Sequence, residues 1–310
     1  MAKKVIFVGG TAFSGSTFFH MALANDVKGF ACGEVRWIFY PHRPDHVEQM
    51  NQAPKETSAI WRTLREKGAK NLYQSLFDLF PQVEFIVDSS KNPIWIQSQM
   101  TQLRKQGIEA KNILIWKTPL EFANSTKKRG RLQNWDKEWL NYHRLYTSLI
   151  PEWKGVKYRD FASNDAFLEQ ICTYLGIPYF DGKLNYWEKQ HHSFGGNYTA
   201  RFHLHEKKTA QKEYLDKTFD SGRLDGYRKI SYSQVDDQEL ENRIQHRLKS
   251  MPEFDSILAL LESKDVGHSS EKMEGETAVK FSPHMLQLRK LHYYLRSYRG
   301  KLRYDRFVKI

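Results

Sequence analysis

Residues 9–17 of this chain, Gly-Gly-Thr-Ala-Phe-Ser-Gly-Ser-Thr, have the composition of a loop that holds an anion. The stretch follows an apolar run at residues 5–8 and precedes a segment with helical character. A strand–loop–helix turn directs backbone N–H groups and the positive end of the helix dipole to one point, so it suits phosphate or sulfate. The spacing of Gly10 and Gly15 matches a nucleotide-binding loop, but Ser16 stands where such a loop has its lysine. The sequence therefore predicts an anion site, with an ordinary glycine turn as the alternative.

Three further charged residues lie next to short motifs or apolar runs. Glu34 belongs to a Cys-Gly-Glu triplet, Lys91 ends an Asp-Ser-Ser-Lys run, and Lys117 follows the apolar residues 113–116. A carboxylate can act as a general base, and a lysine can neutralise a charged leaving group. Without further context, Glu34 is also compatible with a solvated loop carboxylate. Lys91 is likewise compatible with a surface lysine at the start of the helix that Pro93 enters.

Short apolar runs and longer helical segments must position these residues. The runs lack apolar/polar alternation, which is typical of parallel strands covered on both faces. The sequence therefore predicts an α/β fold with three layers, a central parallel β-sheet flanked by helices, and helical C-terminal additions. The expected strands are residues 5–8, 85–87, 113–116 and 156–158. The expected helices are residues 16–25, 92–106, 166–175, 236–249 and 253–261.

Taken in order, these motifs resemble those of sulfotransferases that use 3′-phosphoadenosine-5′-phosphosulfate (PAPS). The loop resembles the one that binds the 5′-phosphosulfate, which implies that Ser14, Gly15, Ser16 and Thr17 bind the donor. Lys117, with a serine eight residues later and an arginine four residues after that, has the spacing of the 3′-phosphate segment. The family more often has arginine there, and lysine keeps the charge without the bidentate geometry. The 3′-phosphate residues implied are Lys117, Ser125 and Arg129, although a solvated basic helix face would show the same run of charges.

Two other segments resemble the catalytic parts of the family. Residues 31–36, Ala-Cys-Gly-Glu-Val-Arg, are similar to the segment with the catalytic glutamate of tyrosylprotein sulfotransferases, which implies Glu34 as general base. The Asp-Ser-Ser-Lys run resembles the stretch whose lysine reaches the bridging oxygen and the sulfate, which implies Lys91. The chain departs from that subgroup at Phe13, where the subgroup carries an arginine. We therefore do not expect close functional identity with that subgroup.

Two later segments resemble the parts of the family near the adenine and over the donor. Val-Lys-Tyr-Arg-Asp at residues 156–160 resembles the strand beside the adenine, which implies a contact from Tyr158. His-His-Ser-Phe-Gly-Gly-Asn at residues 191–197, with a later arginine, resembles the loop that closes over the donor. The resemblance covers about residues 4–205 and implies a P-loop-like sulfotransferase core. The closing residues implied are Gly196, Asn197 and Arg201.

The resemblance implies transfer of a sulfuryl group from PAPS to an acceptor hydroxyl, with release of 3′,5′-ADP. Glycan modification is expected, with a carbohydrate or lipid-linked glycan as acceptor. No metal is expected, because the mechanism needs none and no His/Cys/Asp cluster has ligand spacing. Cytosolic small-molecule sulfotransferases use a histidine base, so His42 and His46 are alternatives that we rank below Glu34. His20 lies on the apolar side of its helix and is expected in the core.

Two other functional classes remain open at this stage. A P-loop-type kinase of a small molecule or nucleotide would have a lysine at Ser16 and a carboxylate for its metal, for which Asp88 is the one candidate. A basic membrane- or nucleic-acid-binding protein without catalysis would explain the charge. No nucleic-acid-binding signature is present, so nucleic acid is not expected as a partner.

Charge is distributed unevenly along the 310 residues. The chain carries 48 Lys and Arg against 36 Asp and Glu, a net charge of +12. Residues 283–310 hold eight Lys or Arg and one Asp, hence +7. Within this tail, apolar residues recur at helical spacing, which predicts an amphipathic helix that either binds an anionic membrane or folds back as a final helix. These residues are Leu288, Leu291, Leu295, Tyr298 and Leu302.

The domain organisation follows from these patterns. We expect a PAPS-binding core over residues 1–205, a helical extension packed on it over 206–261, a flexible linker over 262–282 and the basic tail over 283–310. No apolar run is long enough to span a bilayer, and the N-terminus lacks a cleavage site. The two cysteines, Cys32 and Cys172, match no zinc or disulfide spacing. A cytoplasmic protein, with peripheral membrane contact through the tail as an option, is expected.

Overall fold

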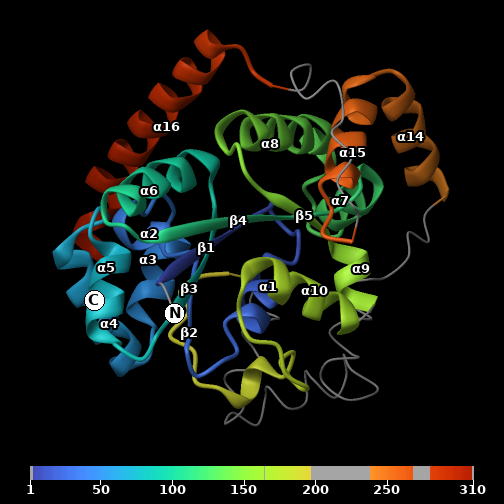
Figure 1. The fold of residues 1–310 in the computed structure, drawn as a ribbon. Coiled ribbons are helices and arrows are strands. Elements are labelled where there is room, and N and C mark those ends of the chain that lie inside the picture. The colour runs from blue at the N-terminus through green and yellow to red at the C-terminus, as the bar shows by residue number, and fades with distance from the viewer. Residues whose placement is uncertain (1–2, 164, 197–237, 268–279, 309–310) are drawn as a thin grey trace, which may run out of the picture.

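Five parallel strands form one sheet in the middle of the molecule, in the order β2-β3-β1-β4-β5 (Figure 1). The structure is a computed structural model and describes residues 3–163, 165–196, 238–267 and 280–308. The predicted fold class is confirmed, and all four predicted strands are present. The fifth, β2, was not predicted, because its sequence Gly-Phe-Ala-Cys-Gly has no β-branched residue. The strands are β1 (Lys4–Gly9), β2 (Gly29–Gly33), β3 (Phe85–Lys91), β4 (Glu109–Trp116) and β5 (Lys154–Lys157).

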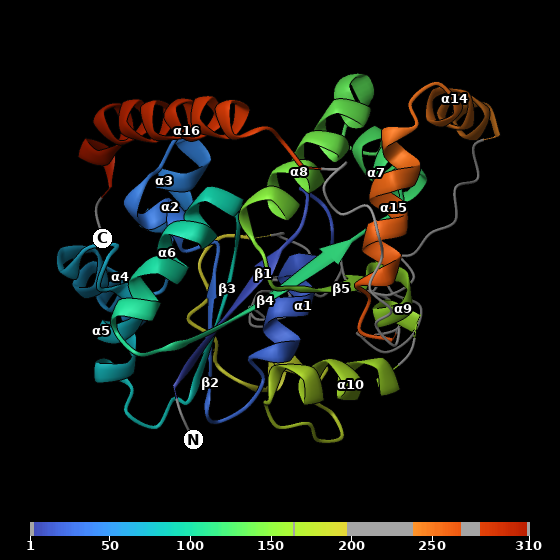
Figure 2. The same cartoon turned by 45° about the horizontal axis from the view of Figure 1, so that its top comes forward.

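Helices cover both faces of the sheet, as Figures 1 and 2 show. On β1, Val5 and Phe7 join one apolar cluster and Ile6 and Val8 the other, and all four side chains are buried. The cluster of Val5 includes α5 (Leu72–Leu79), α6 (Pro93–Lys105) and α8 (Trp135–Leu149). The cluster of Ile6 includes α1 (Ser16–Leu23), α9 (Tyr158–Ser163) and α10 (Asp165–Leu175). Burial on both faces explains why the strand sequences are continuously apolar.

The remaining described helices connect these layers or extend them. The predicted helices over 92–106 and 166–175 correspond to α6 and α10, and Asn92 caps α6 by accepting from the N–H groups of Ile94 and Trp95. The others are α2 (Arg36–Phe39), α3 (Pro44–Asn51), α4 (Lys55–Lys67), α7 (Pro119–Lys127), α14 (Gln238–Lys249), α15 (Glu253–Ser263) and α16 (Pro283–Tyr304), with 3₁₀ turns η1 (Leu132–Asn134), η2 (Tyr186–Glu188) and η4 (Asp305–Phe307).

The chain after α14 continues to build the core. Helices α14 and α15 lie against α7 and α8, and their buried residues, among them Phe254 and Leu261, join the cluster of Val5. The segment 262–267, which we placed in the flexible linker, instead completes α15 and runs beside β5. Asp265 is buried there and accepts the backbone N–H of Lys157 at 3.0 Å. Residues 268–279 of the predicted linker, and residues 206–237 of the extension, lie outside the described residues. At the end of the predicted linker, Ser282 caps α16 by accepting the N–H of Met285.

Two sequence-level expectations about membranes and cysteines can be compared with the fold. Among the helices in the described parts of the chain, none is both long and apolar enough to cross a bilayer. Cys32 and Cys172 are both buried and both free. The predicted tail helix is present as α16, which lies on the outside of the molecule in both views (Figures 1 and 2).

Candidate active site

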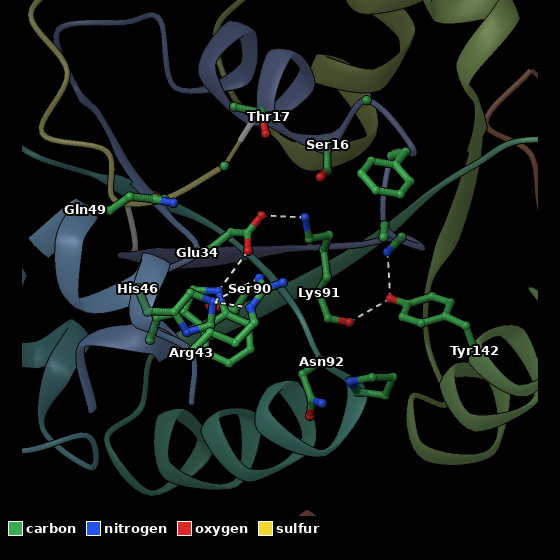
Figure 3. Close-up of a pocket in the computed structure, with 18 of the residues that line it drawn as sticks. Ser16, Thr17, Glu34, Arg43, His46, Gln49, Ser90, Lys91, Asn92 and Tyr142 are labelled. Carbon is green, nitrogen blue, oxygen red and sulfur yellow. Dashed lines mark hydrogen bonds and ion pairs between the residues drawn. The ribbon is translucent and has the colours of Figure 1, made fainter. Parts of the chain in front are cut away.

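A cavity of about 520 Å³ lies where β1, β2 and β3 end. Parallel strands bring their carboxyl ends to the same edge of a sheet, so the loops that follow them share one site. The loop after β1, the residue after β2 and the last residue of β3 all contribute, as Figure 3 shows for Ser16, Glu34 and Lys91. Seven of the predicted site residues line this cavity: Gly15, Ser16, Thr17, Glu34, Lys91, Arg129 and Gly196.

The loop after β1 places the start of α1 at the cavity. Gly15 has a φ of 90°, and a Cβ at this position would lie 2.0 Å from the ring of Tyr158, so only glycine fits. Ser16 and Thr17 form the first turn of α1, which is the positive end of the helix dipole. The loop therefore has the geometry of an anion site. Ser14 does not line the cavity, because its buried side chain lies inside the turn beside Gly10.

Glu34 and Lys91 form an ion pair at the wall of the cavity. Lys91 Nζ lies 2.5 Å from Glu34 Oε1, and Trp37 Nε1 donates to Glu34 Oε2 at 2.8 Å. Burial raises the pKa of Glu34, but the charge of Lys91 and the hydrogen bonds from Lys91 and Trp37 outweigh burial and lower that pKa overall. Glu34 is therefore ionised at neutral pH and oriented by two donors. The sequence analysis assigned Glu34 and Lys91 separately, and the fold brings the two side chains into direct contact.

Tyr142 joins the anion loop to the end of β3. Its hydroxyl accepts the N–H of Gly10 at 2.6 Å and donates to the carbonyl of Lys91 at 2.6 Å (Figure 3). Lys91 has a φ of 63°, which is uncommon for a residue with a side chain and is often found at functional sites. Burial raises the pKa of Tyr142, so its hydroxyl stays protonated and can make both bonds. Tyr142 could not be assigned a role from the sequence, since it lies on α8, 132 residues from Gly10 and 51 from Lys91 along the chain.

Phe13 brings two arginines to the cavity. It has a φ of 65°, and the guanidinium of Arg129 lies 4.2 Å from its ring centre, with that of Arg131 at 5.7 Å. Both arginines line the cavity and follow α7, which ends at Lys127. The ring of Phe13 therefore lies beside two positive charges from another part of the chain. The sequence pattern marked Phe13 as a departure from tyrosylprotein sulfotransferases but did not predict these two contacts.

Lys117, Ser125 and Tyr158 form a compact group on the other side of Gly15. Lys117 Nζ donates to Ser125 Oγ at 3.1 Å and lies 4.6 Å from the ring centre of Tyr158. Burial lowers the pKa of Lys117 to about 8; Glu121 opposes this shift, and Arg129 and Lys128 add to it. None of the three lines the cavity itself, but Arg129 donates to the carbonyl of Ser125 at 2.8 Å and so links the group to it. A buried, partly destabilised cation of this kind favours an anionic ligand.

The segment around Phe194 closes one side of the cavity. The N–H of Glu34 donates to the carbonyl of Phe194 at 2.6 Å, and the N–H of Phe194 donates to the carbonyl of Cys32 at 2.9 Å. Gly196 has a φ of 95°, and a Cβ there would lie 2.8 Å from Thr17. The chain therefore contacts both β2 and the first turn of α1 at this side of the cavity. Asn197 and Arg201 lie outside the described residues.

The histidines separate into a core residue and a cavity residue. His20 is fully buried, and its ring nitrogens contact the carbonyl of Ser16 and the hydroxyls of Ser89 and Ser193 at 2.9–3.0 Å. This agrees with its expected place in the core. His46 lines the cavity, stacks on Trp37 and hydrogen-bonds Arg43. Burial and the charge of Arg43 lower the pKa of His46 to about 4, so it is neutral at pH 7. His42 contacts Trp37 but does not line the cavity.

Asp88 has a structural role. It is buried, and its oxygens accept from Tyr73 Oη at 2.5 Å, Trp95 Nε1 at 2.9 Å and the backbone N–H of Ser90 at 2.6 Å. These bonds hold the end of β3, and Asp88 does not line the cavity. The carboxylate that a kinase would need for its metal is therefore taken up by hydrogen bonds to the protein. Within the described residues, no group of three or more His, Cys, Asp or Glu is arranged to hold a metal ion.

Comparison with known proteins finds similarity at the level of solved structures. No protein-family model and no curated protein matches the chain. A sulfotransferase domain from the curacin biosynthetic pathway is 15% identical with a TM-score of 0.46, covering 80% of this chain and 98% of that one. A sulfotransferase domain from the Synechococcus PCC 7002 olefin synthase is 15% identical with a TM-score of 0.45, covering 79% and 95%. A sulfotransferase from Alicyclobacillus acidocaldarius is 14% identical with a TM-score of 0.33, covering 73% and 96%. The similarity concerns the fold, and the chemistry is argued from this chain's own residues.

Proposed function

We propose that this protein is a sulfotransferase that moves a sulfuryl group from PAPS to an acceptor hydroxyl. The observation that carries the proposal is the Glu34–Lys91 ion pair, which faces the same cavity as the first turn of α1 and Arg129. An ionised carboxylate, a lysine and an anion loop around one cavity are the parts that transfer between two oxygens requires. The donor fits this site, because the loop suits its 5′-phosphosulfate and the buried Lys117 suits its 3′-phosphate.

In this proposal each residue has a defined task. The first-turn N–H groups at Ser16 and Thr17 bind the phosphosulfate, while Lys117, Ser125 and Arg129 select the 3′-phosphate. Glu34 takes the proton of the acceptor hydroxyl while the hydroxyl oxygen forms its bond to sulfur. The bond from sulfur to the phosphate oxygen breaks in line, and Lys91 neutralises the charge on that leaving oxygen. Lys91 contacts Glu34 and can also contact the leaving oxygen. An anion next to Lys91 weakens its ion pair with Glu34, and this raises the pKa of Glu34 and makes it a stronger base.

The acceptor proposed is a carbohydrate or a lipid-linked glycan. The wall of the cavity beside Glu34 carries Arg43, His46 and Gln49, all of which come from α3 or the residue before it. Guanidinium, imidazole and amide groups can donate to and accept from several hydroxyls at once. Trp37 contributes less open surface, because Arg36 and His46 both lie against its ring. Polar side chains therefore define this acceptor wall, in keeping with an acceptor rich in hydroxyl groups.

The proposal is tested by following labelled sulfate from PAPS into acceptors of a fractionated extract. Wild-type protein is expected to label an acceptor, and Glu34→Gln to lower the rate by about 10²–10⁴, the usual contribution of a general base. His46→Asn is the matched control at the same wall and is expected to keep most of the rate. Full activity of Glu34→Gln would exclude Glu34 as the base. Loss in His46→Asn instead would assign the base to the histidine.

A further inference from the structure

Helix α16 is attached to the protein by one narrow face. Arg36, at the start of α2, donates from Nε to Tyr293 Oη at 2.8 Å and from Nη2 to Ser297 Oγ at 2.9 Å. A Cβ at Gly300 would lie 2.7 Å from the carbonyl of Pro41, so the helix and this loop are in close contact. Tyr293, Ser297 and Gly300 are four and three residues apart and share one side of the helix. These contacts fix the rotation of α16 about its own axis.

The opposite side of α16 is an apolar ridge that faces solvent. Its members recur every three or four residues and are between 47% and 63% exposed. Leu286 and Tyr293 pack against the core on the protein side of the helix. The helix therefore has a second apolar face, and that face is turned to solvent, unlike an ordinary surface helix. A contiguous apolar strip of this kind on a protein surface indicates an interaction site. The ridge consists of Leu288, Leu291, Leu295, Tyr298 and Leu302.

Basic residues flank the ridge on both sides. At about 100° per residue, Lys301 falls on one side of it and Arg299 and Arg303 on the other. The acidic residue of this region, Asp305, is paired with Arg65 of α4. Positive charge on both flanks of an apolar strip is the arrangement by which helices lie on anionic lipid surfaces.

A second copy of the chain fits this ridge less well. The spacing of the ridge is that of a two-helix coiled-coil seam, in which the flanking positions pair across the interface. Here those positions are His292 and Arg299 on one side, with Tyr294 and Lys301 on the other. None is acidic, so a partner helix of the same sequence brings no opposite charge in either orientation. The charges thus select an anionic surface over self-association.

We propose that α16 is a docking helix that seats this protein on an anionic lipid membrane, with the leucine ridge in the headgroup–acyl boundary. The proposal stands apart from the enzymatic one, since it rests on α16 alone. Arg36 lies two residues after Glu34, so the docked helix is hydrogen-bonded to the segment that carries Glu34.

The test is sedimentation of the full chain with lipid vesicles. Binding is expected to vesicles of phosphatidylcholine with phosphatidylglycerol, to weaken with salt, and to be poor to phosphatidylcholine alone. Leu291→Asp with Leu295→Asp is expected to lower the partition coefficient at least tenfold. Arg299→Glu with Arg303→Glu is expected to lower it about fivefold for each charge removed. Leu79→Asp, at an apolar residue 45% exposed on α5, is the matched control and should bind as wild type.

Several outcomes would overturn the proposal. The proposal is wrong if the wild type binds no vesicles or binds neutral and anionic vesicles equally. It is also wrong if the Leu291→Asp, Leu295→Asp variant binds as the wild type does. A dimer seen by analytical ultracentrifugation without lipid, and abolished by that variant, would assign the ridge to a second copy instead. Thermal unfolding of each variant confirms that it is folded, which is expected because every substituted side chain is exposed.

Discussion

The two sides of the cavity are built in different ways. The donor side consists of the loop 9–15, the start of α1 and the buried Lys117 group, and tight backbone geometry fixes it at Gly15 and Phe13. The acceptor side consists of side chains from α3 and the residue before it, which project into the cavity from exposed, half-buried and buried positions. In the proposed function, the donor side should therefore tolerate little change, whereas the acceptor side can vary and still leave the donor bound. The proposal thus places selectivity for the donor and adaptability toward acceptors in different segments of the chain.

The largest expected effect comes from Gly15→Ala on the donor side. The new Cβ meets the ring of Tyr158 and adopts a φ of 90°, so we expect a loss on the order of 2–4 kcal/mol in stability and the loss of 3′,5′-ADP binding. Thermal unfolding with and without nucleotide measures both. Gly130→Ala is the control, because φ is 66° there but nothing lies within 4 Å of the new Cβ. Equal effects of the two substitutions would show that Tyr158 does not shape the donor side.

Next in size is the pH dependence that Lys117 confers. Its folded-state pKa of about 8 lies below the ordinary 10.5, so the unfolded chain binds more protons between these values and stability rises with pH across that window. Binding of 3′,5′-ADP should have the opposite trend and weaken as Lys117 loses its proton above about pH 8. Lys117→Met should abolish the binding trend and reduce the stability trend, of which a part remains because burial also lowers the pKa of Lys189 to about 8. Lys67→Met, at an exposed lysine, should change neither. Titration calorimetry across this range measures the affinity, and a pH trend of the affinity retained in Lys117→Met would contradict the assignment.

A smaller effect is expected where the donor loop meets β3. Tyr142→Phe removes the hydroxyl that joins Gly10 to Lys91, so we expect about a tenfold loss of sulfuryl-transfer rate with donor affinity little changed. Tyr146→Phe is a close control, since the buried Tyr146 hydroxyl makes no hydrogen bond to the described residues. Single-turnover kinetics measure the rate of the sulfuryl-transfer step separately from the binding of the donor. If Tyr142→Phe lowers donor affinity and rate equally, the residue supports the loop as a whole and does not position Lys91.

The smallest effect is expected on the acceptor side. Gln49→Ala removes one polar group from the wall, and we expect a two- to tenfold rise in the acceptor KM with the donor KM unchanged, the size of one exchanged hydrogen bond. Steady-state kinetics with the acceptor identified in the labelling experiment measures this. A matching rise in the donor KM would show that the two sides are coupled, contrary to the comparison above.

The parts that could be predicted from the sequence are those encoded locally. Apolar runs identified four strands, and the interval from Lys117 to Ser125 needs only one strand end and about two turns of helix to bring the two into contact. The tyrosine at 142 and the arginine at 131 gave no such signal, because their partners lie on other elements. Strand β2 was missed because pairing with β3, and not local propensity, makes its glycine-rich sequence extended.

The tail shows the limit of periodicity most clearly. The leucines of α16 predict the helix correctly, and the same pattern normally identifies the buried side. Here the buried side is selected by specific contacts from Arg36 to Tyr293 and Ser297, which apolar spacing cannot reveal. The orientation of a helix on a protein therefore depends on which partner surface it meets, and that surface is assembled only in the fold.

The proposed donor site is tested most directly by comparing three nucleotides in calorimetry: 3′,5′-ADP, 5′-AMP and Mg-ATP. Wild-type protein is predicted to bind 3′,5′-ADP at least tenfold more tightly than 5′-AMP, because a charge-assisted bond to the 3′-phosphate is worth roughly 1.5–3 kcal/mol. Lys117→Met should remove most of that difference. Tight binding of Mg-ATP without binding of 3′,5′-ADP would contradict the account and favour a kinase.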